Sequence, residues 1–208
     1  MSADEVQVVL SAIKNDRLRH VWHLALSGLR RDELGGLRWA DIDLENRTLR
    51  IGPTRVSAGG EAIDQDAKSA ASGRTLPLPQ SLADELKAAK RQQAAEKLAF
   101  GEGYGAGGYV ACNEAGQPLH PDTLTKRWKA ILADLDVAQV RLHDASHTCG
   151  TLMHLQGVPI AVIAAWLGRA DSSFTMRTYT HSQADALAAA AASLGSLVTI
   201  RDNEPKSS

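Results

Sequence analysis

Aromatic residues, cysteines and long apolar runs are all scarce in this chain. Aromatics make up 4% of the 208 residues while alanine is plentiful, which favours a core of aliphatic side chains on helices. The two cysteines, Cys112 and Cys149, exclude a framework of several disulfides, and we expect both to be reduced, buried thiols. Since no apolar run approaches the roughly 20 residues that cross a bilayer as a helix, helical membrane spans are not expected.

The chain also lacks an excess of charge of one sign. Its formal net charge of −1 excludes a nonspecific polycation but leaves room for a basic groove on a neutral protein. The first residues, Met1–Glu5, lack the basic and then apolar order of a signal peptide, so we expect a cytoplasmic protein. A chain of this length predicts one large domain or two small ones with a substantial buried core.

Apolar residues at helical spacing recur along most of the chain. They predict helices over residues 6–14, 18–27, 30–37, 81–98, 120–135, from 140 onward with breaks at 157–159 and 168, and 184–192. Ser81 is the expected N-cap of the long fourth helix. The five glycines in Gly101–Gly108 predict a loop, and this loop does not have the strand before it and the helix after it that a dinucleotide site requires.

The remaining segments predict one small sheet. Strands are expected over residues 48–52 and 74–79, and prolines confine the second to a sheet edge. Between them, residues 53–73 are rich in glycine, alanine, serine and charge, which predicts a mobile turn with one short strand at 62–63. The predicted fold class is therefore mostly α with a small antiparallel β-sheet (α+β).

Two residues near opposite ends of the chain are of types that can attack or bind a phosphate group. Tyr179 is a plausible nucleophile if nearby cations stabilise its phenolate, because an unperturbed tyrosine has a pKa near 10. Arg30 follows a glycine turn and opens a helix, where its side chain and the helix N-terminus could both bind a phosphate. Each has a simpler interpretation: Tyr179 could cap an apolar cluster, and Arg30 could form a surface ion pair with Asp32 or Glu33.

Further polar residues lie between them. His143 and His147 are four residues apart and share one helical face, with Ser146 beside them. With His154 they could form a weak metal-binding face, although His-x-x-x-His without a third ligand pattern is poor support for a metal site. Lys68 lies in the turn between the two strands, where it could reach into a groove or simply be solvated.

The order and spacing of four segments resemble the tyrosine recombinases of the phage integrase family. The first-arginine segment of that family is similar to residues 25–43 (ALSGLRRDELGGLRWADID), and its His-x-x-Arg box is similar to residues 142–148 (LHDASHT). Residues 166–169 (WLGR) resemble the box that ends in histidine or tryptophan, and residues 176–181 (MRTYTH) resemble the nucleophile box. The likeness extends from about Val6 to His181.

The resemblance implies cleavage of DNA by two transesterifications. Tyr179 would attack a phosphodiester to form a 3′-phosphotyrosine and free a 5′-hydroxyl, with no cofactor and no metal. Arg30 would hold the nonbridging oxygens and Lys68 would protonate the leaving oxygen. His143 would assist proton transfer. Lys68 qualifies because it precedes a segment, 73–79, that resembles the end of the β-hairpin on which the family carries its lysine.

The resemblance also implies the partners. They are double-stranded DNA with attachment-type sites and further copies of the chain, as a tetramer on DNA, with no membrane and no small-molecule substrate. The residues expected to contact DNA are Arg31, Lys126, Arg127 and Arg177.

Two positions depart from the family pattern. Ser146 stands where the second arginine is expected, and Arg169 stands where histidine or tryptophan is expected. Loss of one preorganised donor to a developing charge costs roughly 10²–10³ in rate, so we expect impaired cleavage. Compensation by Arg169 is the weaker hypothesis, because a guanidinium from a different backbone position rarely reproduces bidentate geometry.

The sequence is also compatible with two other functions. The alternative is a degenerate integrase remnant that binds DNA or a partner recombinase without cutting. A type IB topoisomerase also uses a tyrosine nucleophile, but the integrase-like residues of the motifs and the small size of the chain disfavour it.

The domain organisation follows from the extent of the likeness. Residues 1–181 are predicted to form the catalytic domain and 201–208 a disordered tail. Residues 182–200 form a C-terminal segment that packs either on its own core or in trans on a neighbouring protomer. We expect the core-binding and arm-binding domains to be absent, and DNA affinity therefore to be weak and salt-dependent.

Overall fold

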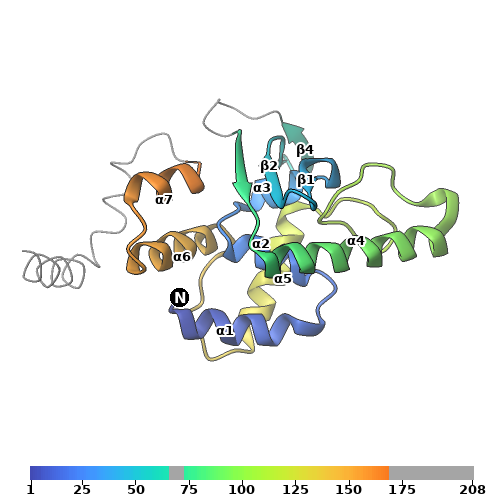
Figure 1. The fold of residues 1–208 in the computed structure, drawn as a ribbon. Coiled ribbons are helices and arrows are strands. Elements are labelled where there is room, and N and C mark those ends of the chain that lie inside the picture. The colour runs from blue at the N-terminus through green and yellow to red at the C-terminus, as the bar shows by residue number, and fades with distance from the viewer. Residues whose placement is uncertain (66–72, 169–208) are drawn as a thin grey trace, which may run out of the picture.

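Seven α-helices and five short strands form the part of the chain that the computed structural model describes, residues 1–65 and 73–168 (Figure 1). The helices are α1 Ala3–Ala12, α2 Arg19–Leu26, α3 Arg31–Gly36, α4 Gln80–Phe100, α5 Pro121–Ala133, α6 Leu142–Leu155 and α7 Ile160–Trp166. The strands are β1 Ile42–Asp43, β2 Thr48–Ile51, β3 Thr54–Ala58, β4 Glu61–Gln65 and β5 Arg74–Pro77. The predicted fold class, mostly α with a small antiparallel sheet, is confirmed.

Local sequence signals explain where several helices begin. Ser2 and Glu5 form a capping box on α1, because the Ser2 hydroxyl accepts from the Glu5 amide at 3.2 Å and the Glu5 carboxylate accepts from the Ser2 amide at 2.6 Å. Helix α5 starts at Pro121, one residue after the predicted start, and His120 is its N-cap. The prediction of Ser81 as an N-cap is wrong: Pro79 takes that position in an extended conformation, and Ser81 lies inside the first turn of α4.

The strands form two antiparallel sheets rather than one. The first has the order β1-β2-β5, and in its register Leu49 lies opposite Ile42 and Leu76, all three buried. The second is the hairpin β3–β4, which turns at Gly59 and Gly60 with φ angles of 62° and 88°. The sequence predicted a turn with one short strand there. The hairpin has few large apolar residues, so its alternation of side chains was too weak to reveal two strands.

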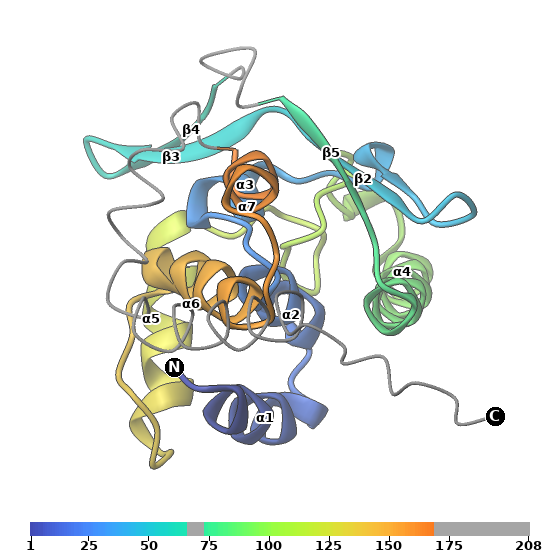
Figure 2. The ribbon, with the colours of Figure 1, turned by 60° about the vertical axis from the view of Figure 1, so that its left-hand side comes forward.

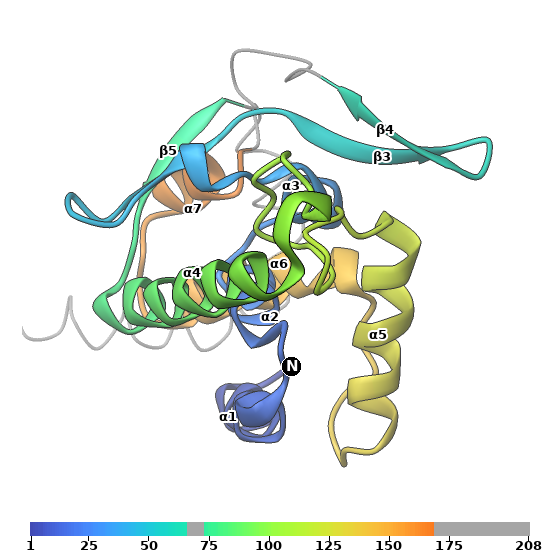
Figure 3. The same cartoon turned by 90° about the vertical axis from the view of Figure 1, so that its right-hand side faces the viewer.

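A charged cluster attaches this hairpin to the rest of the molecule. The Asp64 carboxylate on β4 accepts hydrogen bonds from Tyr109 Oη at 2.5 Å and from Arg55 Nη1 at 2.6 Å. Arg38 donates to the same carboxylate at 3.2 Å, and its guanidinium lies 4.7 Å from the Tyr109 ring centroid. Figure 3 shows the result: β3 and β4 lie over α3 and α5, while β5 lies over α7.

Helix α2 lies at the centre of the core. It packs against α4 on one side and α6 on the other, with the sheets above it and α1 below in the view of Figure 2. The Trp22 ring meets Trp128 of α5 with ring centroids 5.9 Å apart, and aliphatic side chains surround this pair. Cys112 is buried, Cys149 is half-buried, and both are free thiols. In the described ranges, none of the helices has the length and apolarity to cross a membrane.

His20 links the stability of this core to pH. Its side chain on α2 is 3% exposed and one ring nitrogen lies 3.1 Å from the Val110 carbonyl oxygen. Burial lowers the pKa of His20 from 6.5 to about 4. Below pH 6.5 the unfolded chain therefore binds a proton that the folded chain does not, so stability falls as the pH drops from about 6.5 to about 4.

We expect this histidine to account for about 3 kcal/mol of lost stability across that pH interval, at about 1.4 kcal/mol for each pKa unit. Urea unfolding at pH 7, 5.5 and 4.5 measures it. His20→Gln should lower the stability at pH 7 but flatten the pH dependence between 6.5 and 4. An equally steep pH dependence in that variant would show that other groups are responsible.

Gly36 permits close contact between α3 and the start of β3. A Cβ atom at Gly36 would lie 2.5 Å from the Pro53 carbonyl oxygen and 2.8 Å from Thr54 Cα, both backbone atoms. We expect Gly36→Ala to destabilise the protein by about 1–3 kcal/mol, as overpacking typically does. Gly52→Ala is the matched control, because its Cβ would have the flexible end of Arg50 as its nearest neighbour, at 3.9 Å. Thermal unfolding of both variants tests the contact, and equal melting temperatures would refute it.

Candidate active site

Arg30 lies at the start of α3, directly after the turn that ends α2. Gly28 makes this turn with φ 105°, and its α-carbon faces α7, since a Cβ there would lie 3.1 Å from Leu167 Cδ2. Arg30 Nη2 donates to the carbonyl oxygens of Leu167 at 2.8 Å and Gly168 at 3.2 Å. Its side chain remains 30% exposed. The predicted phosphate-binding arginine is thus held by two carbonyl groups while part of its side chain remains exposed.

The carboxylate of Glu33 organises the residues around Arg30. Glu33 is 4% exposed, and its Oε2 accepts from the Arg30 backbone N–H at 2.8 Å. Arg30 Nη1 lies 3.6 Å from Glu33 Oε1, so the simpler interpretation of Arg30 as an ion-pair partner of Glu33 also describes the structure. A buried carboxylate requires such partners, because an unpaired charge in this environment is strongly destabilising.

A second arginine, Arg74, lies at this site and was not predicted from the sequence. Arg74 opens β5, and its side chain is 8% exposed. It donates to both oxygens of Glu33, at 2.8 and 3.2 Å, and its Nε donates to the Trp166 carbonyl oxygen at 2.7 Å. A signal was present: in a strand, alternate residues share a face, so Arg74 had to lie on the buried face with Leu76 and needed an acidic partner.

The end of α7 completes this cluster. The Trp166 indole N–H donates to the Ser27 carbonyl oxygen at 2.8 Å, which ties α7 to the α2–α3 turn. The carbonyl groups of Trp166, Leu167 and Gly168 lie at the end of α7 and just beyond it, and the two arginines donate hydrogen bonds to them. Cations at this end also match the negative pole of the helix.

Helix α6 carries the predicted histidine. His143 is exposed, and its ring lies 6.3 Å from that of His147, so the shared face predicted from their spacing is present. Ser146 is buried at 4% exposure, and its hydroxyl donates to the His143 carbonyl oxygen at 3.0 Å. Within residues 1–65 and 73–168, the suggested metal face with His154 does not meet the geometry of three potential metal ligands in one group.

Three of the other predicted residues lie in the described part of the chain, and the rest lie outside it. Arg31 pairs with Asp32 at 2.9 Å and with Asp122 at 3.6 Å, so its charge is already balanced within the protein. Lys126 and Arg127 are exposed on α5. The residues that lie outside the described part of the chain are Lys68, Arg169, Arg177 and Tyr179.

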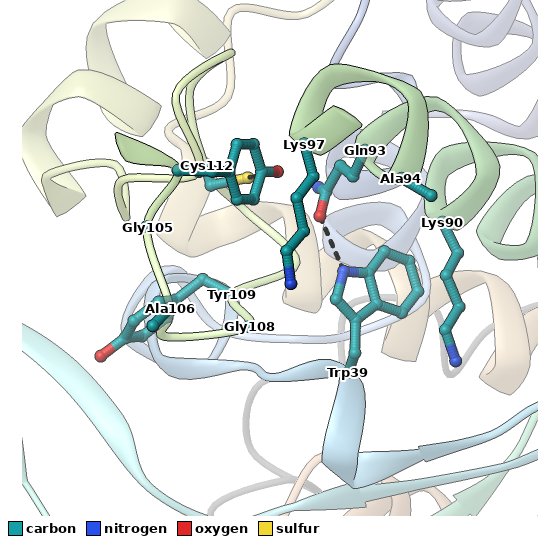
Figure 4. Close-up of a pocket in the computed structure, with 12 residues that line it drawn as sticks. Trp39, Lys90, Gln93, Ala94, Lys97, Gly105, Ala106, Gly108, Tyr109 and Cys112 are labelled. Atoms are coloured by element: carbon teal, nitrogen blue, oxygen red, sulfur yellow. Dashed lines mark hydrogen bonds between the residues drawn. The ribbon is translucent and has the colours of Figure 1, made fainter. Parts of the chain in front are cut away.

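A separate hollow of about 280 Å³ lies between α4 and the loop that follows it (Figure 4). The Trp39 indole donates to Gln93 Oε1 at 2.7 Å, and Gln93 Nε2 donates to the Val110 carbonyl oxygen at 2.9 Å. Lys90 and Lys97 extend along the two sides of Trp39 in this view. Neither Arg30 nor Glu33 lines this hollow, which is therefore distinct from the arginine cluster.

Comparison with known proteins gives consistent matches. The model of the phage integrase family matches residues 1–186. A tyrosine recombinase XerC-like protein of Caldanaerobacter subterraneus subsp. tengcongensis is 35% identical over 86% of this chain and 49% of its own length. An integrase of Saccharopolyspora erythraea is 28% identical over 87% of this chain and 53% of its own length. The chain thus spans about half the length of these curated relatives.

The fold has a counterpart among solved structures. The integrase of the Tn1549 transposon, solved in complex with transposon right end DNA, superposes with a TM-score of 0.76 at 18% identity. The superposition covers 94% of this chain and 65% of that one. The fold, the order of the motifs and the extent of the family match agree, and the chain belongs to the phage integrase family of tyrosine recombinases.

Proposed function

We propose that this chain is the catalytic domain of a site-specific DNA recombinase that acts on attachment-type sites, with Tyr179 as the nucleophile. The observation that carries the proposal is the placement of Arg30 at the N-terminus of α3, fixed by Glu33 and the end of α7 and still 30% exposed. A preorganised guanidinium beside a helix N-terminus provides charge for a phosphate without further reorganisation. Residues 1–181 are the proposed extent of the domain.

The proposed chemistry is a pair of transesterifications on double-stranded DNA. The phenolate of Tyr179 attacks the phosphorus, and the bond to the 5′-oxygen breaks as Lys68 supplies the proton to that oxygen. Arg30 binds the nonbridging oxygens, and His143 assists proton transfer. The free 5′-hydroxyl of a second strand reverses the step, so the energy of the phosphodiester is kept in the covalent link. Strand exchange between two sites requires several copies of the chain, and we propose a tetramer on DNA.

The proposed contacts with the DNA backbone come from exposed cations. Lys126 and Arg127 on the outer face of α5 are available for phosphates, and Arg177 is proposed to join them. Arg31 contributes once its bonds to Asp32 and Asp122 are exchanged for bonds to phosphate. The solved complex of the Tn1549 integrase with DNA supports a DNA ligand for this fold.

Impairment of cleavage is part of the proposal. The hydroxyl proton of Ser146 is engaged by the His143 carbonyl within α6, so this side chain does not replace the charged donors of an arginine. Arg169 is the weaker candidate for compensation. The engaged hydroxyl of Ser146 also favours the second candidate function, a module that binds DNA or another recombinase without cutting. In either function, residues 182–200 are the proposed contact with a neighbouring protomer or with the chain's own core.

A covalent-trapping assay tests the nucleophile and the role of position 146 together. The labelled DNA duplexes carry a nick, so that the cleaved leaving strand dissociates and the covalent adduct accumulates. The sequence around the nick is randomised, so that the target site need not be known. We expect little adduct from the natural chain and about 10²–10³ times faster adduct formation from Ser146→Arg. Denaturing electrophoresis measures the adduct, and Tyr179→Phe should abolish it in both backgrounds.

Two controls keep the outcomes distinct. Ser146→Ala removes the hydroxyl without adding charge, and thermal unfolding checks that the larger side chain in Ser146→Arg is tolerated at this buried position. Rapid adduct formation by the natural chain that is lost in Arg169→Ala would establish compensation instead of impairment. Retained DNA binding with no adduct from any variant would favour the binding module.

A further inference from the structure

Arg74 joins three segments that are distant in the sequence. It lies on β5, its carboxylate partner Glu33 lies on α3, and its third acceptor is the carbonyl group of Trp166 at the end of α7. These bonds measure 2.7–3.2 Å, and the arginine and glutamate side chains are 8% and 4% exposed. Two parallel N–H···O bonds to one carboxylate fix orientation as well as distance.

The same three segments hold Arg30. Glu33 Oε2 accepts from the Arg30 backbone N–H at 2.8 Å, while Arg30 Nη2 donates to the carbonyl oxygens that follow Trp166, those of Leu167 and Gly168. A closed circuit therefore runs from Arg74 through Glu33 to Arg30 and returns through the end of α7. Any displacement of Glu33 or of these carbonyl groups displaces the Arg30 side chain.

The turn after α7 is shaped around Arg74. Gly168 has φ +62°, and a Cβ atom at this position would lie 2.5 Å from Arg74 Nη1 and 2.9 Å from Arg74 Cζ. The backbone thus approaches the guanidinium more closely than any residue with a side chain would permit. This approach brings the Gly168 carbonyl group within reach of Arg30.

We propose that Arg74 is a positioning residue for Arg30: it orients Glu33 and the carbonyl groups at the end of α7 and just beyond it so that the Arg30 guanidinium faces the scissile phosphate. The effect on catalysis depends on the proposed recombinase function, whereas the geometric coupling does not. Arg74 itself is buried and makes no contact with DNA in this scheme. A lysine at this position keeps the charge but loses the bidentate geometry and the separate bond to the Trp166 carbonyl.

The chain provides a matched control in Arg17. Its Nε and Nη2 bond both oxygens of Glu96 at 2.8 and 2.6 Å, and its Nη1 donates to the Cys112 carbonyl oxygen at 2.6 Å. Arg17 thus shares with Arg74 a bidentate carboxylate and a bond to a backbone carbonyl group, and it also donates to the Asn113 carbonyl oxygen at 3.0 Å. It precedes α2, whereas Arg30 follows the end of that helix. Arg17→Lys therefore reproduces the loss of stability without the link to Arg30.

The first experiment uses the full chain without DNA. Hydrogen exchange by NMR follows the Arg30 amide, which bonds Glu33, and the Trp166 indole N–H, which bonds the Ser27 carbonyl group. In Arg74→Lys we expect both protons to exchange about tenfold faster or more, and in Arg17→Lys we expect them to be unchanged. Unchanged exchange in Arg74→Lys would overturn the proposal, whether or not the chain cleaves DNA.

The second experiment measures cleavage in whichever background forms the covalent adduct, the natural chain or Ser146→Arg. At saturating DNA, Arg74→Lys should slow adduct formation by about 10- to 100-fold while leaving the Kd for DNA within about threefold. Arg17→Lys should alter neither quantity at a temperature where both variants are folded. Equal slowing by the two variants would reduce Arg74 to a structural role and overturn the proposal.

A second variant protects the test against misfolding. Glu33→Gln keeps the shape of the side chain but removes the charge that pairs with both arginines. If Arg74 acts through Glu33, the double variant Arg74→Lys/Glu33→Gln should lose no more rate than the more damaging single variant. Multiplied losses would mean that the two residues act independently, which contradicts the proposed circuit. Absence of adduct in every background would count against the recombinase function, and hydrogen exchange would then decide the coupling alone.

Discussion

The buried carboxylate of Glu33 is the constraint on which the rest of the site depends. It lies at 4% exposure between Arg74 and Arg30, and both arginines also donate to carbonyl groups at the end of α7. Removing Arg74 would leave this buried carboxylate with the partly exposed Arg30 as its remaining ion-pair partner among the described residues, which is destabilising. The connection between α2 and α3, the start of β5 and the end of α7 are therefore joined by one polar network, which lies beside the apolar contacts of Trp166 and Leu167.

This network also explains why bulk charge says little about function here. Cations near the site are paired locally, since Arg30 and Arg74 share Glu33 and Arg31 contacts Asp32 and Asp122. The net charge of −1 is a sum over such paired charges and over exposed cations such as Lys126, so it does not distinguish them. What distinguishes Arg30 from an ordinary surface arginine is that its backbone N–H and its guanidinium are held by protein acceptors while its side chain stays 30% exposed.

Particular elements show how far prediction from sequence reached. Helices α2 and α5 were predicted within a few residues, because their apolar spacing and their turn residues agree. The hairpin β3–β4 was predicted only as a turn with a short strand, since Asp64 and Tyr109, far apart in sequence, hold it in place. Ser81 was wrong as an N-cap because Pro79 already fixes the extended conformation before α4. At the site, Arg30 and His143 were identified by motif, whereas Arg74 and the buried role of Glu33 were not.

The sequence by itself determined the family and the helical class and supplied the candidates for phosphate chemistry, because these follow from local spacing and from ordered motifs. Only the tertiary structure decided which arginines share a carboxylate, that the Ser146 hydroxyl is engaged by its own helix, and that Gly168 must lack a side chain beside Arg74. The physical reason is that pairing between buried charges depends on contacts across more than 40 residues of chain, from Glu33 to Arg74 and on to Trp166. Local propensity carries no information about such contacts.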